Sequence, residues 1–275
     1  MSTYFADKIC VVTGAGSGIG RATALELADN GVGHLVMADI NRENLEATQK
    51  LVTEAGAAAS IVQLDVSNRE AIYDLAEQTL ATHGQVDFVL NNAGIANIAP
   101  VESLAIEDFE RVMNVDFWGV VHGTQAFLPS MIQRDFGHIA NISSIFGFIG
   151  VPNQGAYNSA KFAVHGFTEA LRQEMYGTGV KISCVHPGGI DTQIARNAIL
   201  PQGEDSDERR EEIATNFKTM VKSTPLQAAQ TILRGVEKGK ARILIGRDAH
   251  MVDIIRRIFP TRYGDILGFR NVADV

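Results

Sequence analysis

Short apolar stretches rich in β-branched residues alternate with longer segments of helical periodicity along most of the chain. Seven stretches predict strands, at residues 8–13, 34–39, 60–65, 87–91, 138–143, 180–186 and 242–245. Several are apolar throughout, which is typical of parallel strands covered on both faces. Segments of ten residues or more between them, such as 21–30 and 43–55, predict helices. This alternation predicts an α/β fold, with a doubly wound and mostly or wholly parallel seven-stranded sheet.

The alternation is stretched in one place, between the strands that end near residue 186 and begin at residue 242. This interval contains a loop rich in Pro and Gly and then the charged run 204–212. The run indicates the start of a solvated helix, with Asp205 as N-cap and Glu208 three residues later. Because doubly wound sheets bind ligands at the carboxyl ends of their strands, we expect a helical substrate lid at about residues 190–222.

Composition narrows the class of protein. The 275 residues are 45% hydrophobic and 20% charged, which excludes a disordered or collagen-like chain. The formal net charge of -8 disfavours nucleic-acid binding, which depends on Lys and Arg at phosphates. The two cysteines, Cys10 and Cys184, lie in apolar runs and predict buried strand residues, with neither a metal site nor a disulfide framework. With no linker or repeat, residues 1–275 predict a single domain.

No segment has the features of a membrane span or a signal peptide. The N-terminal residues lack a basic stretch followed by a long apolar one. The most apolar long stretch, 139–151, is shorter than the roughly 20 residues that a transmembrane helix needs. We therefore expect a cytoplasmic protein. The C-terminal extension at about 248–275 is amphipathic and basic; a membrane surface and a second subunit are alternatives to packing on its own domain.

A glycine-rich segment follows the first predicted strand and begins a helix. Its sequence is Thr-Gly-Ala-Gly-Ser-Gly-Ile-Gly at residues 13–20. Glycines permit a tight turn and close approach of a pyrophosphate, and the helix N-terminus offers free N–H groups. A plain turn is the alternative, but a strand before and a helix after it favour a Rossmann-type dinucleotide site. The predicted contacts here are Gly14, Ser17, Gly18, Ile19 and Gly20.

Asp39 ends the next predicted strand, nineteen residues after Gly20. A carboxylate there can accept hydrogen bonds from the adenosine ribose hydroxyls and would repel a 2′-phosphate. It could instead cap the helix that begins near Arg42. We favour the ribose role, which predicts NAD as the cofactor. NADP remains an alternative, since Arg21 or Arg42 could reach a 2′-phosphate.

Tyr157 and Lys161 are four residues apart in a segment of strong helical pattern, so they lie on one helix face. An ammonium beside a phenol favours the phenolate and lowers the tyrosine pKa from about 10. Tyr157 would then serve as a general acid/base for an alcohol/carbonyl pair. Ser143 and Ser144 end the preceding predicted strand, where a hydroxyl could hold a substrate oxygen or simply cap the strand end.

The order and spacing of these motifs resemble those of the short-chain dehydrogenase/reductase family of the single-domain, Tyr-x-x-x-Lys type. The resemblance covers about residues 5–250 and includes the glycine-rich turn, Asn-Asn-Ala-Gly at 91–94, Asn114, and Pro187-Gly188. Ser144 precedes Tyr157 by thirteen residues, which matches the family spacing and favours it over Ser143.

The resemblance implies a role for each matching residue. Tyr157 exchanges the substrate proton, and Lys161 holds the nicotinamide ribose and lowers the pKa of Tyr157. Ser144 binds the substrate oxygen, and Asn114 positions a water that links Lys161 to solvent. It also implies a homodimer or homotetramer and these further cofactor contacts: Asp65, Val66, Asn92, Ala93, Gly94, Pro187, Gly188, Ile190 and Thr192.

The sequence indicates the substrate less directly than the cofactor. The residues expected around it are largely apolar and provide no fixed cation, which favours a neutral small-molecule alcohol or ketone, bulky or steroid-like ones included, over a small acid: Ile95, Ala96, Ile145, Phe146, Phe148, Val151, Gln154, Gly189 and the segment from Ile194 onward. An NAD-dependent secondary-alcohol dehydrogenase is the favoured function. The alternatives are an NADP-dependent carbonyl or oxoacyl reductase and a non-catalytic nicotinamide-binding sensor. We interpret His186, beside Pro187, as a core histidine because no second metal ligand lies near it in the sequence.

Overall fold

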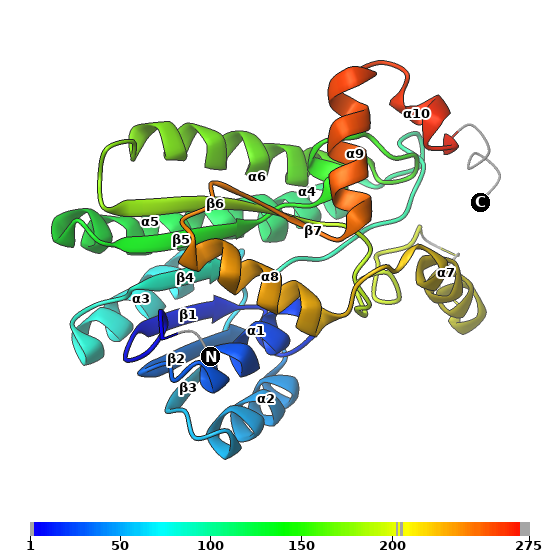
Figure 1. The fold of residues 1–275 in the computed structure, drawn as a ribbon. Helices are drawn as coiled ribbons and strands as arrows, with labels where there is room; N and C mark the ends of the chain where they lie inside the picture. The colour runs from blue at the N-terminus through cyan, green and yellow to red at the C-terminus, as the bar shows by residue number, and fades with distance from the viewer. Residues whose placement is uncertain (1–2, 202, 204–205, 270–275) are drawn as a thin grey trace.

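The computed structural model describes residues 3–201, 203 and 206–269, and its centre is a seven-stranded parallel sheet (Figure 1). The strand order is β3-β2-β1-β4-β5-β6-β7, with every neighbouring pair parallel. The doubly wound parallel sheet predicted from the sequence is confirmed, with boundaries within two residues of those expected. The strands are β1 (Ile9–Thr13), β2 (His34–Asp39), β3 (Ala59–Gln63), β4 (Phe88–Asn91), β5 (Gly137–Ile142), β6 (Val180–Pro187) and β7 (Arg242–Ile245).

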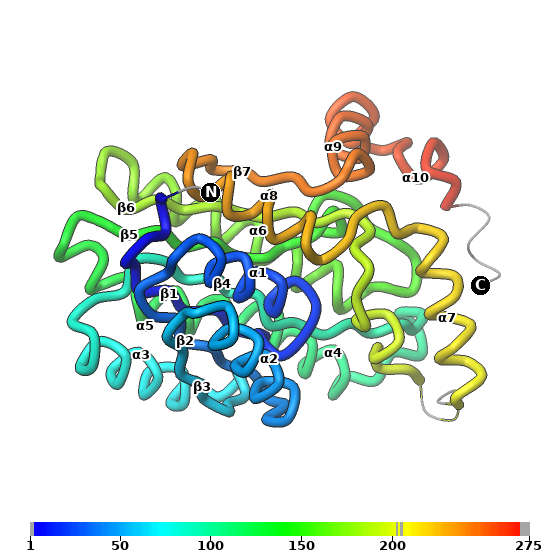
Figure 2. Tube along the Cα trace, turned by 60° about the horizontal axis from the view of Figure 1, so that its bottom comes forward, coloured from blue at the N-terminus to red at the C-terminus, as the bar shows by residue number. Residues whose placement is uncertain are grey.

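Helices cover both faces of the sheet, which explains why the central strands are apolar throughout. One buried cluster joins α1, α2 and α8 to one face, and a second joins α3, α5 and α6 to the other (Figures 1 and 2). The helices are α1 (Gly18–Asp29), α2 (Arg42–Glu54), α3 (Arg69–His83), α4 (Ile106–Met113), the π-helix η1 (Asn114–Trp118), α5 (Gly119–Arg134), the 3-10 helix η2 (Ile145–Gly147), α6 (Gly155–Glu174), α7 (Asp207–Met220), α8 (Pro225–Glu237), α9 (Arg247–Ile258) and α10 (Tyr263–Ile266).

The strand order reverses between β1 and β4. The chain goes outward from β1 through β2 to β3 and then returns to pair β4 with the other side of β1. Doubly wound sheets bind ligands in the crevice beyond the carboxyl ends of the strands at such a reversal. The glycine-rich turn after β1 and the Asn-Asn-Ala-Gly segment after β4 both lie there.

The segment expected to form a lid contains α7, which lies at one end of the molecule (Figure 1). The N-cap of α7 is Ser206, whose side chain accepts a hydrogen bond from the Arg209 N–H at 3.1 Å. The prediction of Asp205 as N-cap is therefore wrong, and Asp205 itself lies outside the described residues. Both types of residue are good caps, so the backbone path decides which one is used.

The described part of the C-terminal extension, up to residue 269, packs on its own domain. Val252 of α9 joins a buried cluster with Phe148, and Arg256 donates a hydrogen bond to the Phe148 carbonyl at 3.1 Å. The outer side of α9 exposes Met251 and Ile254. Among the described residues, no helix has the length and apolar composition of a membrane span.

Candidate active site

The glycine-rich turn approaches the β4 loop so closely that side chains would not fit. Gly14 has φ +65°, and a Cβ there would lie 2.8 Å from the Ala93 Cα. Gly18 also has positive φ, and Ser17 precedes α1 as an N-cap whose side chain makes no capping hydrogen bond. The first N–H groups of α1, those of Gly18, Ile19 and Gly20, therefore receive no capping hydrogen bond from Ser17.

Two predicted motifs meet at the strand reversal. The Thr13 hydroxyl accepts hydrogen bonds from the backbone N–H groups of Asn92 (3.0 Å) and Ala93 (3.2 Å). The Asn92 side chain donates back to the Thr13 carbonyl at 2.9 Å. These bonds hold the segment after β4, from Asn92 to Gly94, against the glycine-rich turn.

Asp39 lies at the carboxyl end of β2, beside the turn. One carboxylate oxygen accepts from the Gly16 N–H at 2.8 Å and the other from the Asn41 N–H at 2.9 Å. The N-cap of α2 is Asn41, whose side chain accepts from the Asn44 N–H. Asp39 is therefore not the helix cap that was its alternative role.

The two arginines that could favour a 2′-phosphate are both engaged by other groups. Arg21 donates to the Thr48 hydroxyl at 2.9 Å and to the Gly16 carbonyl, bracing the turn against α2. Arg42 forms an exposed ion pair with Glu46 at 2.7 Å.

The remaining predicted cofactor contacts follow β3 and β6 along the chain. Asp65 accepts hydrogen bonds from the Ser67 N–H and hydroxyl, and Val66 is buried against Gly119. Beyond β6, which ends at Pro187, the chain passes through Gly188 and the buried Ile190 to Thr192. A Cβ on Gly18 would lie 3.2 Å from the Thr192 side chain, so this segment returns to the glycine-rich turn.

Tyr157 and Lys161 occupy one face of α6, as their spacing predicts. The Lys161 Nζ lies 5.4 Å from the centre of the Tyr157 ring. Ser144 follows β5, caps η2 by accepting from the Phe146 N–H at 3.1 Å, and lies close enough to Tyr157 for its hydroxyl to lower the pKa of that phenol. The structure thus brings together a hydroxyl, a phenol and an ammonium, which are the groups needed to bind an oxygen and exchange its proton.

The group closest to Lys161 is one that the sequence analysis missed. Asp116, in the π-helix η1, forms an ion pair with the Lys161 Nζ at 2.9 Å, and both side chains are buried. Asn114, at the start of η1, is exposed, and no described interaction joins it to Lys161. A carboxylate within the apolar run Val-Asp-Phe-Trp was the available signal, because a buried charge requires a partner.

Burial alters the ionisation of this cluster. Burial raises the pKa of Tyr157 and outweighs the lowering by Lys161; Asp116 raises it further, and the Ser144 hydrogen bond lowers it. This differs from the net lowering expected from the Tyr-Lys spacing alone. Burial lowers the pKa of Lys161, but the carboxylate of Asp116 and the phenol of Tyr157 raise it above its ordinary value. The protein without ligands therefore holds a neutral phenol beside a charged ammonium.

Apolar groups line one side of Tyr157. Phe146 packs edge to face with it at 6.0 Å between ring centres, and Ile95 belongs to the same packed cluster. Phe148, expected to line the substrate site, is instead buried in the cluster beneath α9 and stacks on His186. His186 is bonded through Nδ1 to the Ser144 carbonyl at 3.0 Å, in agreement with its interpretation as a core residue.

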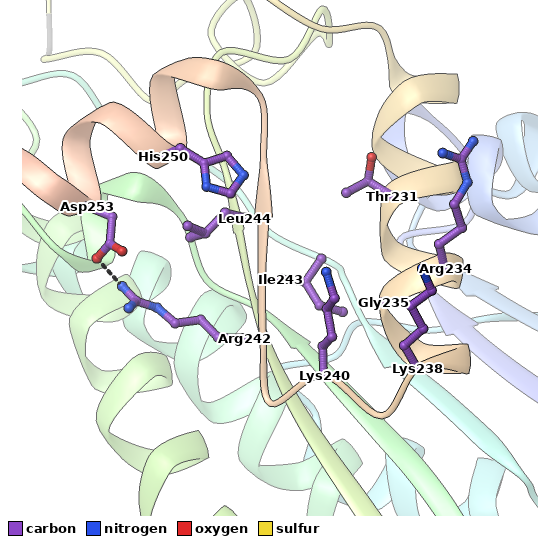
Figure 3. A pocket seen from close by; sticks show the side chains of 10 residues that line it. All are labelled: Thr231, Arg234, Gly235, Lys238, Lys240, Arg242, Ile243, Leu244, His250 and Asp253. Carbon is purple, nitrogen blue, oxygen red and sulfur yellow. Dashed lines mark hydrogen bonds and ion pairs between the residues drawn. The ribbon is translucent and has the colours of Figure 1, made fainter.

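A separate hollow of about 470 Å³ lies between α8, β7 and α9 (Figure 3). It contains none of the residues predicted to bind cofactor or substrate. Within the described ranges, no group of His, Cys, Asp and Glu is arranged to bind a metal ion. The hollow is lined by Thr231, Arg234, Gly235, Lys238, Lys240, Arg242, Ile243, Leu244, His250 and Asp253.

Comparison with known proteins agrees with this geometry. Residues 8–203 match the sequence pattern of the family described as short chain dehydrogenase. A putative oxidoreductase of Mycobacterium tuberculosis, SadH, is 48% identical over 262 residues, covering 94% of this chain and 93% of its own.

Solved structures show the same fold with cofactors bound. A short-chain dehydrogenase/reductase from Burkholderia phymatum in complex with NAD has a TM-score of 0.82 and 30% identity, covering 96% of this chain and 95% of its own. A metagenomic short-chain oxidoreductase in complex with NADP has a TM-score of 0.72 and 25% identity, covering 88% of this chain and 98% of its own.

Proposed function

The chain belongs to the short-chain dehydrogenase/reductase family, and we propose that it is an NAD-dependent enzyme for a secondary alcohol/ketone pair. The single observation that carries this proposal is the grouping of Ser144, Tyr157 and Lys161 beside the crevice at the β1–β4 reversal. A hydroxyl, a phenol and an ammonium together suit proton exchange with a carbinol oxygen.

The residues of the crevice fit a dinucleotide. The turn has no room for a Cβ at Gly14, its backbone at Gly18 has a positive φ that favours glycine, and α1 presents uncapped N–H groups to a pyrophosphate. The walls of the site come from the segments after β4 and β6. When bound, the nicotinamide would supply the hydride acceptor or donor. The residues proposed to hold it are Gly14, Ser17, Gly18, Ile19, Gly20, Asp39, Asp65, Val66, Asn92, Ala93, Gly94, Tyr157, Lys161, Pro187, Gly188, Ile190 and Thr192.

Three side chains of the protein have separate roles at the substrate oxygen. Ser144 donates a hydrogen bond to that oxygen and orients it toward the phenol. Tyr157 as phenolate removes the hydroxyl proton in oxidation and, as phenol, returns it in reduction. Lys161 stabilises the phenolate and binds the ribose. Because burial raises the pKa of Tyr157, we expect alcohol oxidation to increase with pH and ketone reduction to be favoured at lower pH.

NAD is preferred in this proposal because of Asp39. A carboxylate beside the turn matches ribose hydroxyls and repels a 2′-phosphate. Both nearby arginines are bound to protein acceptors, Arg21 to Thr48 and Arg42 to Glu46. An NADP-dependent carbonyl reductase is the second candidate, supported by the relative that binds NADP. A non-catalytic sensor is disfavoured because the proton-transfer groups are all present.

A neutral substrate is supported by the apolar surroundings of Tyr157. Phe146 packs edge to face on the ring and Ile95 belongs to the same cluster as Tyr157, while the charged groups next to the ring, Lys161 and Asp116, are paired with each other. A substrate with its own charge would have to bury it without a partner here.

Absorbance of reduced nicotinamide tests the proposal. Purified protein with NAD⁺ or NADP⁺ and a panel of cyclic, aromatic and steroidal secondary alcohols should give signal with NAD⁺. Signal with NADP⁺ alone would make the second candidate correct. Binding of reduced cofactor with no turnover of any alcohol or ketone would contradict the enzymatic proposal and favour the sensor.

A further inference from the structure

Asp116 is held by two contacts, one from α6 and one from the loop after β4. Its Oδ2 pairs with the Lys161 Nζ of α6 at 2.9 Å, and its Oδ1 accepts the Ile95 N–H of the β4 loop at 2.8 Å. Lys161 also donates to the Ile142 carbonyl at the end of β5 at 3.2 Å. Asp116 is 0% exposed and Lys161 is 2% exposed. The ammonium is thus fixed from two sides in a site closed to water.

The π-helix explains how Asp116 reaches this place. Within η1, Asn114 and Trp118 are exposed while Asp116 points inward and is fully buried. A π-turn between α4 and α5 changes the angular position of the residues that follow it, and such turns are frequent at functional sites. The turn therefore directs a carboxylate, rather than the Asn114 amide, at Lys161.

We propose that Asp116 is a positioning residue for Lys161, fixing its ammonium and neutralising the positive charge that Tyr157 faces. This inference rests on the proposed function of Tyr157 and Lys161. Asp116 acts on the phenol in two ways: its negative charge disfavours the phenolate directly, and it offsets the Lys161 ammonium that favours the phenolate. Asp116 thus sets the pH at which the site can accept a substrate proton.

The charged and titratable groups that act on this cluster come from three elements. They are Asp116 of η1, Tyr157 and Lys161 of α6, and the thiol of Cys184 in β6. Burial raises the pKa of Cys184 to about 12, so the thiol stays neutral and leaves Asp116 as the carboxylate that offsets Lys161.

The test is an Asp116→Asn variant, which keeps an oxygen for the Ile95 N–H and removes the charge. Tyrosinate absorbance is titrated in the full-length protein, and the same titration in a Tyr157→Phe background is subtracted to isolate one of the five tyrosines. We expect the Tyr157 midpoint to fall by about one pH unit. The pH of half-maximal alcohol oxidation should fall equally, with little change in the KM of the alcohol.

Asp87→Asn is the matched control. Asp87 is also buried, pairs with Arg134 at 3.0 Å and accepts the Ile9 N–H at 2.9 Å, but it does not act on Tyr157. It should leave the Tyr157 midpoint unchanged. Asp116→Glu, which restores the charge, should return the midpoint toward that of the wild type.

An unchanged midpoint in Asp116→Asn, or an equal shift in Asp87→Asn, would overturn the inference. If Asp116→Asn does not fold, a Gly94→Ala variant is used instead. Its methyl would lie 3.0 Å from Asp116 Oδ2 and 3.4 Å from Lys161 Nζ, so it should disturb this ion pair and lower the Tyr157 midpoint by a smaller amount. An unchanged midpoint there would equally overturn it. The tyrosinate titration does not depend on turnover. If no alcohol is oxidised, the proposed function is contradicted, but the titration still tests the role of Asp116.

Discussion

The Asp39 carboxylate accepts a hydrogen bond from the Gly16 N–H at 2.8 Å, which joins the end of β2 to the glycine-rich turn. The other oxygen accepts from the Asn41 N–H at 2.9 Å, so the carboxylate is fixed in place beside the turn. Orientation by the protein reduces the ordering that cofactor binding would otherwise require. This contact also explains why Asp39 and the turn should act as one unit in selecting the cofactor.

Asp39→Ala should shift the preference from NAD toward NADP. Removing the carboxylate removes both its ribose acceptor and its repulsion of a 2′-phosphate, so the ratio of kcat/KM for NAD over NADP should fall at least about tenfold, equal to about 1.4 kcal/mol. Steady-state kinetics with both cofactors measures the ratio. Glu43→Ala, which removes an exposed carboxylate from the start of α2, is the control. An equal change in both variants would exclude a specific role for Asp39.

Tyr157→Phe should abolish turnover and leave cofactor binding within a few-fold of the wild type. The phenylalanine keeps the packing against Phe146 but cannot exchange a proton, and such a loss costs about 10²–10⁴-fold in rate. Turnover is measured by nicotinamide absorbance and binding by fluorescence titration. Tyr176→Phe, at an exposed tyrosine, is the matched control and should remain active. Activity above a few per cent in Tyr157→Phe would remove this residue from the mechanism.

The fold was predictable because its dominant signal is local. Each strand is a short apolar run between helical segments, and the strands begin or end within two residues of prediction. The glycine-rich turn and the Tyr157–Lys161 pair were predictable for the same reason, since spacing alone places them on one turn or one helix face.

The carboxylate at Lys161 could not be found from spacing. In a regular α-helix, residues two apart do not share a face, and helical spacing does not show where a π-turn occurs, so spacing does not reveal that η1 buries Asp116 and exposes Asn114. The prediction that Phe148 lines the substrate site was wrong for a related reason. Its loop has no periodicity, and packing against His186 and α9 decides which side it faces.

Gly14→Ala should weaken cofactor binding at least about tenfold. An alanine there is strained at φ +65°, and its Cβ would lie 2.8 Å from the Ala93 Cα, which pushes the turn away from the β4 loop. Fluorescence titration with the reduced cofactor measures the affinity. Gly31→Ala separates strain from crowding, because Gly31 has φ +73° with nothing within 4 Å of its Cβ. It should lose some stability and keep its affinity; equal weakening in both would contradict the crowding argument.

His138 should make the protein less stable as the pH falls below about 6.5. Its Nε2 lies 2.7 Å from the Ser183 hydroxyl, which itself donates to the Lys240 carbonyl, so Nε2 carries the proton. A second proton would enter at Nδ1, a buried atom without a partner among the described residues. Burial lowers the pKa of His138 to about 3 from its ordinary 6.5, with a smaller lowering by Lys181.

The direction of this pH effect on stability follows from the protons bound by the folded and the unfolded chain. Between pH 6.5 and 3 the unfolded chain binds a proton at this histidine that the folded protein does not, so acidification favours unfolding. At pH 5 the difference is about 2 kcal/mol in the free energy of unfolding. Urea denaturation at pH 7 and pH 5 measures it. His138→Asn, although less stable at pH 7, should lose about 2 kcal/mol less than the wild type over this interval, whereas His250→Asn, at an exposed position, should follow the wild type. A pH dependence unaltered in His138→Asn would mean that this imidazole is already charged in the folded protein.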